Sequence, residues 1–406
     1  MKSNLLVGQS GGPTAVINGS LYGIVTSGLQ SDSIDHVYGM INGIEGYLND
    51  NFIDMETLSA EGELEYIRTT PGSYLGSCRY KLPEDLNDPV YPVLFDKFSK
   101  QNIRYFFYIG GNDSMDTVSK LSRYAAQINY DISIIGVPKT IDNDLMETDH
   151  TPGFGSAAKF VASSVREIST DASVYDNKKS VTIIEIMGRH AGWLAASSVL
   201  ARKFKGDNPS LIYLPEVSFD IDEFINKLRK KLDLTPNLIV CISEGIHTED
   251  GTFICELASD IGTDTFGHKM LTGSGKYLEN LVKEKLGVKV RSIELNVCQR
   301  CSSAMLSATD LNEAVQSGKF AVSSALNGET GKMITFVRET DSPYKLHFST
   351  ADVNIICNKE KTVPVEWITE DGSDIGPEFI TYALPLIQGT VDIPMENGLP
   401  RFAYRR

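Results

Sequence analysis

The chain has 406 residues, more than a single hydrophobic core usually holds, so two or three domains are expected. Its formal net charge of −15 argues against a nucleic-acid-binding protein, because neutralising a phosphate backbone requires a basic face. The N-terminus shows no signal-peptide pattern and no apolar run is as long as a membrane span, so we expect a cytoplasmic protein without a membrane partner.

Short apolar runs alternate with amphipathic stretches along most of the chain. The predicted strands are residues 4–7, 35–40, 105–109, 132–137, 181–186, 211–214, 238–242 and 290–295. The predicted helices are residues 15–27, 116–127, 156–172, 192–202, 222–231 and 302–317. This alternation predicts an α/β fold with parallel sheets and right-handed crossovers, in which ligands bind at the carboxyl ends of the strands.

Two regions depart from the alternation. Residues 246–276 are polar and glycine-rich, which predicts loops and a short helix. Residues 331–406 contain several prolines and look more strand-like, so we interpret them as a C-terminal extension packed on the main body.

Glycine-rich turns follow two of the predicted strands. The turn Gly8–Thr14 contains adjacent glycines, including Gly12, that let the backbone approach an anion closely. The turn at residues 109–116 also opens a helix, where Ser114 can cap the helix or contact a phosphate oxygen. Asp113 can cap the same helix, bind Mg²⁺ or narrow the pocket. Taken alone, the first turn is equally compatible with an ordinary strand-to-helix connection, and helix capping without ligand binding is the simpler alternative for the second.

The run Pro138–Asp144 carries the strongest chemical signal in the sequence. Asp142 and Asp144 stand two residues apart beside Lys139, a grouping that is costly to assemble without a ligand. Phosphoryl transfer requires a base for the attacking hydroxyl, a carboxylate for Mg²⁺ and a cation for the transferring group. The run supplies all three and predicts a phosphotransferase centre, with a solvated acidic turn as the simpler alternative.

Charged residues also follow three later strands or lie on them. Arg189 can hold a phosphoryl oxygen through two hydrogen bonds, and Glu244 can hold a sugar hydroxyl. Arg291 and Arg300 lie nine positions apart and can contact one phosphate from two sides.

The order of these motifs resembles that of the phosphofructokinase family over about residues 4–320. The matching segments are Gly11-Gly12, Gly110-Gly111-Asn112-Asp113-Ser114, Thr140-Ile141-Asp142-Asn143-Asp144, Met187-Gly188-Arg189, Glu244-Gly245 and Gln299-Arg300. The resemblance implies two Rossmann-like parallel-sheet lobes. Residues 1–150 would be the phosphoryl-donor lobe, which also receives a later segment, residues 151–330 the sugar-phosphate lobe, and residues 331–406 the extension. It also implies a glycolytic, Mg²⁺-dependent transfer to the 1-hydroxyl of fructose 6-phosphate.

The resemblance assigns a role to each matching residue. Asp142 corresponds to the catalytic base, with Lys139 and Arg189 as the cations that act on the transferring group. The residues expected to bind the donor are Gly12, Arg79, Gly111, Asp113 and Ser114. The residues expected to bind the sugar phosphate are Thr140, Asp144, Met187, Gly188, Glu244, Arg291 and Arg300. Asp113 and Asp144 are the expected metal ligands.

Two departures from the ATP-dependent pattern indicate the donor. ATP-using members of the family usually carry glycine where this chain has Asp113 and where it has Lys139, whereas the pyrophosphate-dependent branch carries an acid and a lysine there. A carboxylate at Asp113 fills and charges the space that an α-phosphate and a nucleoside would occupy. Lys139 supplies a cation to a compact, highly charged donor. We therefore expect pyrophosphate as the donor, with fructose 1,6-bisphosphate and orthophosphate as products of a reversible reaction.

Two further departures concern the metal and the sugar phosphate. Asn112 stands where many members have a metal-linked aspartate, so Asp113 or Asp144 would carry more of the Mg²⁺ binding. Val297 stands where many bacterial members have a histidine that contacts the sugar phosphate, so the arginines or another residue such as Lys276 would replace it.

Three alternatives remain open. The first is an ATP-dependent 6-phosphofructokinase, and the second is a catalytically inactive subunit that senses sugar phosphates. The third, a dinucleotide-dependent dehydrogenase, is disfavoured because the chain lacks the GxGxxG turn. The resemblance also implies a homodimer or homotetramer with active sites shared between chains.

Overall fold

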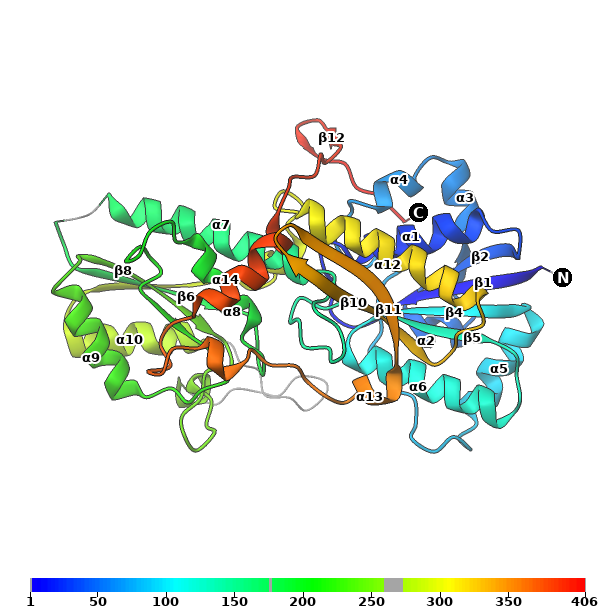
Figure 1. Ribbon diagram of the computed structural model, residues 1–406, viewed down its shortest axis with the longest axis horizontal. Helices are drawn as coiled ribbons and strands as arrows, with labels where there is room; N and C mark the ends of the chain where they lie inside the picture. The colour runs from blue at the N-terminus through cyan, green and yellow to red at the C-terminus, as the bar shows by residue number, and fades with distance from the viewer. Residues whose placement is uncertain (1, 175–176, 259–272, 406) are drawn as a thin grey trace. The chain divides into compact units, whose positions relative to one another are not determined.

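The computed structural model describes residues 2–174, 177–258 and 273–405 and divides into two compact units (Figure 1). Unit 1 comprises Met1–Ser156, Arg300–Glu360 and Leu386–Arg406, and unit 2 comprises Ala157–Gln299 and Lys361–Pro385. The units interleave along the chain, so the expected extension 331–406 is shared between them. The boundaries near residues 150 and 330 stay predictions about functional domains.

A seven-stranded sheet forms the centre of unit 1, in the order β11-β10-β5-β4-β1-β2-β3. Its strands are β1 (Ser3–Gln9), β2 (Ile34–Met40), β3 (Phe52–Asp54), β4 (Ile103–Gly110), β5 (Ser133–Pro138), β10 (Lys332–Asp341) and β11 (Tyr344–Asp352). The inner strands run parallel to one another, whereas the edge strands β3 and β11 pair antiparallel with their neighbours. Buried strands such as β1 and β4 read as continuous apolar runs because both faces of the sheet are covered.

Helices cover both faces of this sheet. They are α1 (Ile17–Leu29), α2 (Gly43–Leu48), α3 (Met55–Ala60), α4 (Leu64–Ile67), α5 (Val90–Lys100), α6 (Asn112–Gln127), α12 (Ala308–Leu326) and α13 (Val353–Ile356). The short helix α11 (Cys298–Cys301) contains the point in the chain where unit 2 gives way to unit 1. Leu5 and Val7 share a buried cluster with residues of α1 and α12, whereas Leu6 belongs to a cluster formed with α5 and α6. Figure 1 shows the two helix layers on opposite sides of the strands.

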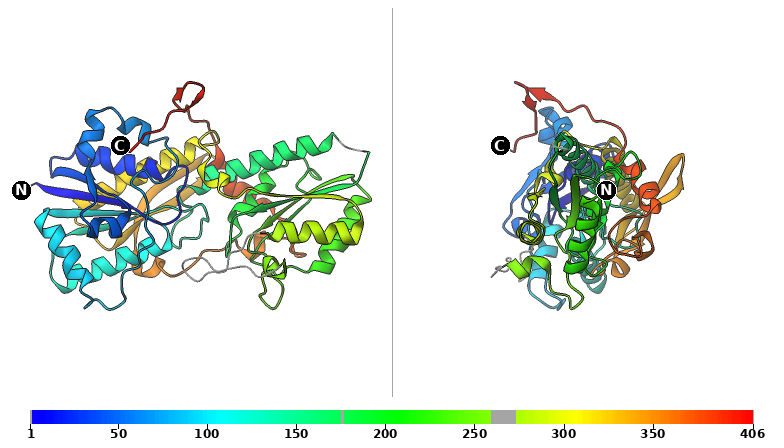
Figure 2. Two further views of the ribbon diagram at one scale, coloured as in Figure 1. Left: turned by 180° about the vertical axis from the view of Figure 1, so that it is seen from behind. Right: turned by 90° about the vertical axis from the view of Figure 1, so that its left-hand side faces the viewer.

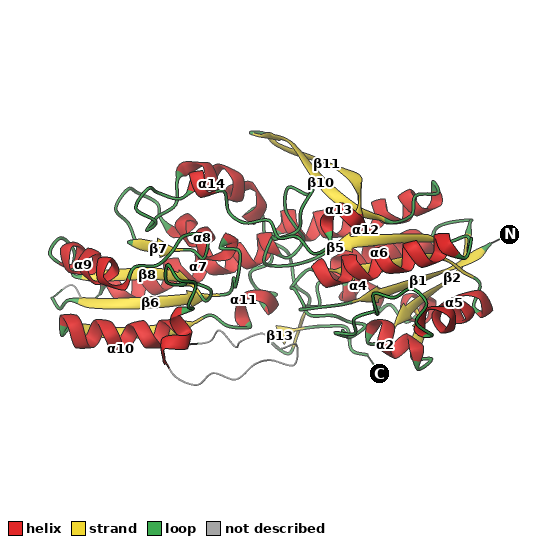
Figure 3. Cartoon of the chain, turned by 90° about the horizontal axis from the view of Figure 1, so that it is seen from below, coloured by secondary structure: helices red, strands yellow, loops and turns green. Residues whose placement is uncertain are grey.

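Unit 2 contains a smaller, fully parallel sheet in the order β7-β8-β6-β9 (Figure 3). Its strands are β6 (Ser180–Ile186), β7 (Leu211–Tyr213), β8 (Asn237–Ser243) and β9 (Lys289–Glu294). Its helices are α7 (Phe154–Ser173, which begins in unit 1), α8 (Trp193–Ser197), α9 (Ile221–Leu232), α10 (Ser274–Leu286) and α14 (Pro377–Ala383). Apolar side chains of α9 and α10 pack on one face of the sheet, and α7 and α8 lie on the other (Figure 2).

The structure confirms all eight predicted strands, the α/β class with parallel sheets and four of the six predicted helices. The helix predicted at residues 192–202 is confirmed in part, because it is α-helical only over Trp193–Ser197 and continues as a 3₁₀ helix over Ser198–Ala201. The helix predicted at residues 302–317 is wrong at its start. Ser307 is the N-cap of α12 and accepts a hydrogen bond from the Asp310 amide, so the helix begins six residues later and runs to Leu326. The hairpin of β10 and β11 extends the main sheet and is therefore part of the body of unit 1.

Two further predictions concern the segment 246–276 and the absence of membrane-spanning helices. Of the segment 246–276, which was predicted as loops and a short helix, residues 259–272 lie outside the described part. The rest holds a short 3₁₀ helix at Ile254–Ala258 and the start of α10. Among the described helices, none has the length and apolar character needed to span a bilayer.

Glycines let α1 and α12 pack in backbone contact. A Cβ atom on Gly23 would lie 2.1 Å from the carbonyl oxygen of Val315, and one on Gly318 would lie 2.2 Å from that of Ser20. These distances are far below van der Waals contact, and a backbone carbonyl cannot swing aside as a side chain can. The two glycines therefore determine how closely the helices approach beneath the glycine-rich turn.

We expect Gly23→Ala to lower the free energy of unfolding by about 1–3 kcal/mol, because the helices must separate to admit the methyl group. Alanine is the better helix former, so helix propensity alone predicts the opposite sign. Urea denaturation followed by circular dichroism measures the change, with the exposed Gln316→Ala on α12 as the matched control. A Gly23→Ala protein as stable as the wild type would contradict this packing.

Candidate functional site

Three loops of unit 1 leave the carboxyl ends of adjacent strands. In the sheet register Gln9 pairs with Ile109, and Gly110 pairs with Pro138, so the ends of β1, β4 and β5 lie side by side. The glycine-rich turn, the start of α6 and the run Pro138–Asp144 therefore meet at one edge of the sheet, as the strand alternation predicted.

Lys139 is a buried cation beneath the glycine-rich turn. Its side chain is only 2% exposed, and its Nζ donates to the carbonyl oxygen of Gly12 at 2.5 Å. A Cβ atom on Gly11 would lie 3.4 Å from the Lys139 ammonium, and one on Gly12 would lie 3.5 Å from a guanidinium nitrogen of Arg300. Two positive groups thus converge on a stretch of backbone without side chains, as an anion cradle requires.

Asp142 and Asp144 place negative charge beside this lysine. Both carboxylates are half-buried, and both act electrostatically on Lys139. Burial raises the pKa of Asp142 above its ordinary value, although Lys139, a hydrogen bond from Thr140 and Arg300 oppose the shift. Burial likewise lowers the pKa of Lys139 to about 8, with the two carboxylates opposing that shift. The carboxyl group of Asp142 is therefore a stronger base than an exposed aspartate.

The chain reverses between the two carboxylates and then returns. Asn143 adopts a left-handed conformation (φ 57°), which asparagine tolerates better than most residues, and its side chain accepts from the Thr151 amide at 3.0 Å. The Thr151 hydroxyl donates to the carbonyl of Thr140 at 2.8 Å, and Thr140 forms a parallel bridge with Gly153. These bonds close residues 140–153 into a compact loop with Asp142 near its start.

The other donor-side residues line the start of α6 and the loop before α5. Gly111 is the N-cap residue of α6, and Ser114 is buried in its first turn against Gly110, where a Cβ atom would be 1.9 Å from the Ser114 hydroxyl. Asp113 is 73% exposed and forms an ion pair with Lys81 at 3.1 Å. Arg79 is exposed on the same loop as Lys81.

Buried amides attach the Arg79 loop to the glycine-rich turn. The Gln9 side chain accepts from the Leu75 amide and donates to Asn18, which in turn donates to the carbonyls of Thr70 and Gly72. Gln9 and Asn18 are fully buried, so their hydrogen bonds are costly to break. The loop's position is thus determined by the core.

Sequence reasoning missed two parts of this site. Lys81 was not predicted as the partner of Asp113, because ion pairs between loops leave no periodic signal. Asn112, discussed as a replaced metal ligand, instead binds the backbone of the segment 358–360: it accepts from the Asn358 amide at 2.5 Å and donates to the Lys359 carbonyl. This brings Glu360 close enough to raise the pKa of Asp142.

The predicted sugar-phosphate residues of unit 2 gather at the carboxyl ends of β6 and β8. Gly188 is in the positive-φ region (140°), its amide donates to Glu244 at 3.4 Å, and its carbonyl accepts from Ser243. The Met187 amide donates to the side chain of Gln299 at 3.3 Å. Arg189 passes so close to Gly245 that a Cβ there would be 1.9 Å from the Arg189 carbonyl. Met187, Gly188, Arg189 and Glu244 therefore form one cluster.

Arg291 lies away from that cluster. It is exposed on the edge strand β9 and pairs with Thr182, in the first half of β6. At about 3.3 Å per residue it sits roughly 16 Å along the strand from Met187. Arg300 belongs to unit 1, where it acts electrostatically on Lys139 and Asp142.

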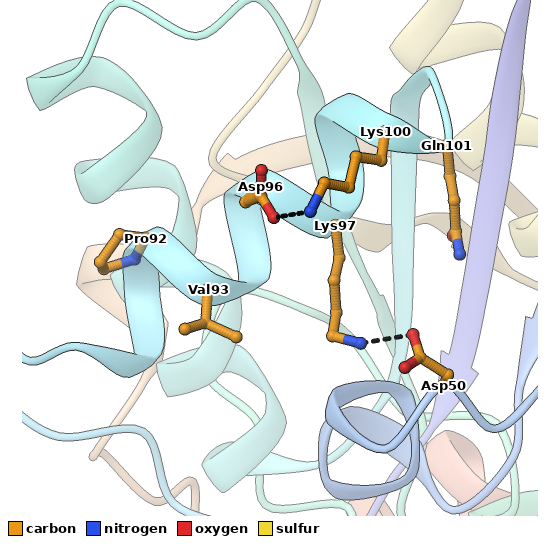
Figure 4. Close-up of a pocket in the computed structure, with 7 residues that line it drawn as sticks. All are labelled: Asp50, Pro92, Val93, Asp96, Lys97, Lys100 and Gln101. Atoms are coloured by element: carbon orange, nitrogen blue, oxygen red, sulfur yellow. Dashed lines mark hydrogen bonds and ion pairs between the residues drawn. The ribbon is translucent and has the colours of Figure 1, made fainter.

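A separate surface depression of about 450 Å³ lies beside α5 (Figure 4). It is lined by Asp50, Pro92, Val93, Asp96, Lys97, Lys100 and Gln101, none of which was predicted as a site residue. Its charged groups are paired with one another, Lys97 with Asp50 and Lys100 with Asp96. It therefore offers no uncompensated charge to a phosphorylated ligand.

Comparison with known proteins gives a consistent result. A phosphofructokinase family model matches residues 4–325. A pyrophosphate--fructose 6-phosphate 1-phosphotransferase of Halomonas elongata is 40% identical and aligns over 98% of this chain and 95% of its own length. A sulfofructose kinase of Alkalicoccus urumqiensis is 32% identical, with 90% of this chain and 91% of the relative covered.

Solved structures give the same answer. The crystal structure of a pyrophosphate-dependent phosphofructokinase from Marinobacter aquaeolei superimposes with a TM-score of 0.89 at 37% identity, covering 100% of this chain and 96% of that one. A Pichia pastoris phosphofructokinase, at 19% identity and a TM-score of 0.67, shares the fold. With its family match over most of the sequence and its relatives at 40% identity, this chain belongs to the phosphofructokinase family.

Proposed function

We propose that this protein is a pyrophosphate-dependent 6-phosphofructokinase that reversibly converts fructose 6-phosphate and pyrophosphate to fructose 1,6-bisphosphate and orthophosphate. The observation that carries the proposal is the buried Lys139 ammonium, which lies beneath the Gly11-Gly12 backbone and beside Asp142. The relatives at 39–40% identity that bear the name pyrophosphate--fructose 6-phosphate 1-phosphotransferase support it.

Asp142 acts as the base that accepts the proton of the sugar 1-hydroxyl. Burial raises the pKa of Asp142 above its ordinary value, which makes the carboxylate a stronger base towards the hydroxyl proton. Lys139, with a pKa of about 8, remains mostly charged near pH 7 and stabilises the negative charge on the phosphoryl group during its transfer. Arg189 is the second cation that we expect to act on the transferring group.

The carboxylates of Asp142 and Asp144 fit a magnesium site. Both act on the same lysine, and carboxylate oxygens are the ligands that Mg²⁺ prefers. We propose Asp144 as the main ligand, because Asp113 is exposed and paired with Lys81. When bound, Mg²⁺ neutralises charge on the donor oxygens.

Asp113 acts as the donor gate, by which we mean that its carboxylate determines which phosphoryl donor can bind. Its carboxylate stands in the first turn of α6, and the exposed Lys81 ion pair holds it there. An α-phosphate entering this space would meet a negative charge, whereas pyrophosphate ends before it. Gly12, Gly111, Ser114 and Arg79 bind the pyrophosphate itself.

The acceptor site uses Thr140, Met187, Gly188 and Glu244 for the sugar, with arginines for the 6-phosphate. Because Arg291 lies exposed on an edge strand, about 16 Å along the sheet from Met187, we propose that it serves the site of a second copy in a homodimer or homotetramer. The thiols of Cys78, Cys241, Cys255 and Cys357 form no disulfide, which fits a reducing, cytoplasmic compartment.

A donor panel tests the proposal. With fructose 6-phosphate and Mg²⁺, we expect turnover with pyrophosphate and at least about 100-fold lower kcat/KM with ATP, a difference of about 2.7 kcal/mol in transition-state binding. Reverse turnover with orthophosphate and the bisphosphate is also expected. Efficient turnover with ATP and none with pyrophosphate would refute the donor assignment. Because one relative is named a sulfofructose kinase, the same assay with sulfofructose in place of fructose 6-phosphate tests which sugar is the acceptor.

Replacing the base tests its role. We expect Asp142→Asn to lower kcat by roughly 10²–10⁴, the usual effect of losing a group that transfers a proton, while the fold is kept. The exposed Asp131→Asn, two residues before β5, is the matched control and should retain full activity. A kcat for Asp142→Asn equal to that of the wild type would remove Asp142 from the mechanism.

The gate is tested by a pair of variants. We expect Asp113→Gly to gain activity with ATP and lose activity with pyrophosphate, because both the volume and the charge of the carboxylate are removed. Asp113→Asn keeps the volume and removes only the charge, so the two variants separate steric from electrostatic exclusion. If neither changes the ratio of kcat/KM values for the two donors, the gate lies elsewhere.

A further inference from the structure

A buried histidine lies directly beside the loop that carries Asp142. His150 is 1% exposed, and its two ring nitrogens each face a carboxylate at 2.7 Å: Nδ1 meets Asp149 and Nε2 meets Glu313 of α12. An imidazole can donate from both nitrogens only when it is protonated. The geometry therefore assigns an imidazolium ion to this site, held between two negative groups.

The two carboxylates are themselves attached to the β10–β11 hairpin. Arg338 of β10 donates to Asp149 from Nε at 3.1 Å and from Nη2 at 2.9 Å, and the Tyr344 hydroxyl of β11 donates to Glu313 at 2.7 Å. The buried carboxylates of Asp149 and Glu313 are thus matched by two cations, and Arg338 also pairs at 3.0 Å with the half-exposed Asp341. A buried network whose members are all paired is rigid, since each bond lost would leave a buried charge.

This network is one residue away from the bonds that shape the reacting loop. Thr151, next to His150, donates both to the carbonyl of Thr140 and to the side chain of Asn143, the residues that flank Asp142 closely. A second anchor lies just beyond, where Asp310 of α12 accepts from the Gly153 amide at 2.9 Å. The segment that returns from Asp144 is thus fastened to α12 on both sides of Thr151.

We propose that His150 is a positioning residue: as an imidazolium it fastens the return segment to α12 and the β10–β11 hairpin, and through Thr151 it fixes the placement of Asp142. This rests on the proposed role of Asp142 as the base. His150 itself is buried and is not one of the residues that we propose to bind substrate or Mg²⁺. Loss of its anchorage would shift the base, and a displacement of about 1 Å at a reacting group can cost about 100-fold in rate.

A double-mutant cycle tests the proposal. We expect His150→Gln to lower kcat about 10-fold or more with KM values for pyrophosphate and fructose 6-phosphate changed less than about 3-fold, and to have no further effect on kcat in an Asp142→Asn background. His347→Gln, which removes an exposed histidine paired with Glu339 on the same hairpin, is the matched control and should leave kcat unchanged. An unchanged kcat for His150→Gln, or an equal fall in both backgrounds, would overturn the proposal.

A second readout separates this inference from the proposed function. Hydrogen exchange of the Thr151 amide should be faster in His150→Gln than in the wild type, and unchanged in His347→Gln, whether or not Asp142 is the base. If Asp142→Asn is fully active, the proposed function fails, and unchanged exchange at Thr151 overturns the anchoring itself. Glu313→Gln, which keeps the shape and removes the charge, is expected to give the same exchange result should His150→Gln not fold.

The pH dependence of stability provides an independent check. The paired carboxylates outweigh burial and raise the pKa of His150 from 6.5 to about 9. The stabilisation is therefore complete below about pH 6.5 and is lost as pH rises to about 9. The difference in melting temperature between wild type and His150→Gln should shrink over this window. The other groups facing the histidine (Asp149, Glu313, Arg338 and Tyr344, with Asp310 nearby) remain in both proteins, so a constant difference would contradict a charged His150.

Discussion

The site depends on keeping one ammonium group out of water and beside carboxylates. Lys139 is almost fully buried, and an isolated buried lysine would lose its charge. Asp142 and Asp144 oppose that loss, while the Gly12 carbonyl accepts a hydrogen bond from the ammonium. The same burial makes Asp142 a stronger base. In the function that we propose, this one desolvated group of charges provides both a cation for phosphoryl oxygens and a base for a hydroxyl.

Much of the surrounding structure holds that group in place. Adjacent ends of β1, β4 and β5 bring the loops together, buried amides such as Asn18 fix the Arg79 loop, and the His150 network anchors the return segment. Asn112 ties the segment near Glu360 to the same region. The Asn18 and His150 anchors are polar and buried, so their hydrogen bonds gain strength from the low local dielectric, whereas the hydrogen bonds of Asn112 are exposed.

The sequence predicted those features of the fold and the site that depend on local sequence patterns. The strand-helix alternation gave the parallel sheets, and the positions of motifs after β4, β5, β6 and β8 predicted which residues would lie at the strand ends. It could not predict the Lys81–Asp113 ion pair, the His150 network or the hydrogen bond between the Asn112 side chain and the Asn358 amide. These contacts join residues that lie far apart in the chain. The start of α12 was missed because Ser307, its N-cap, lies in a stretch where several serines could cap equally well. Arg291 shows a further limit, since its spacing from Arg300 suggested one phosphate while the strand register separates it from the Met187 cluster.

The most direct test is the affinity of the protein for pyrophosphate with and without the buried ammonium. Isothermal titration with pyrophosphate and Mg²⁺ should show binding to the wild type and at least about 10-fold weaker binding to Lys139→Met, which fills a similar volume without charge, because a charge-assisted hydrogen bond contributes about 1.5–3 kcal/mol. Equal affinities in two equally folded proteins would contradict the claim that Lys139 forms the donor site.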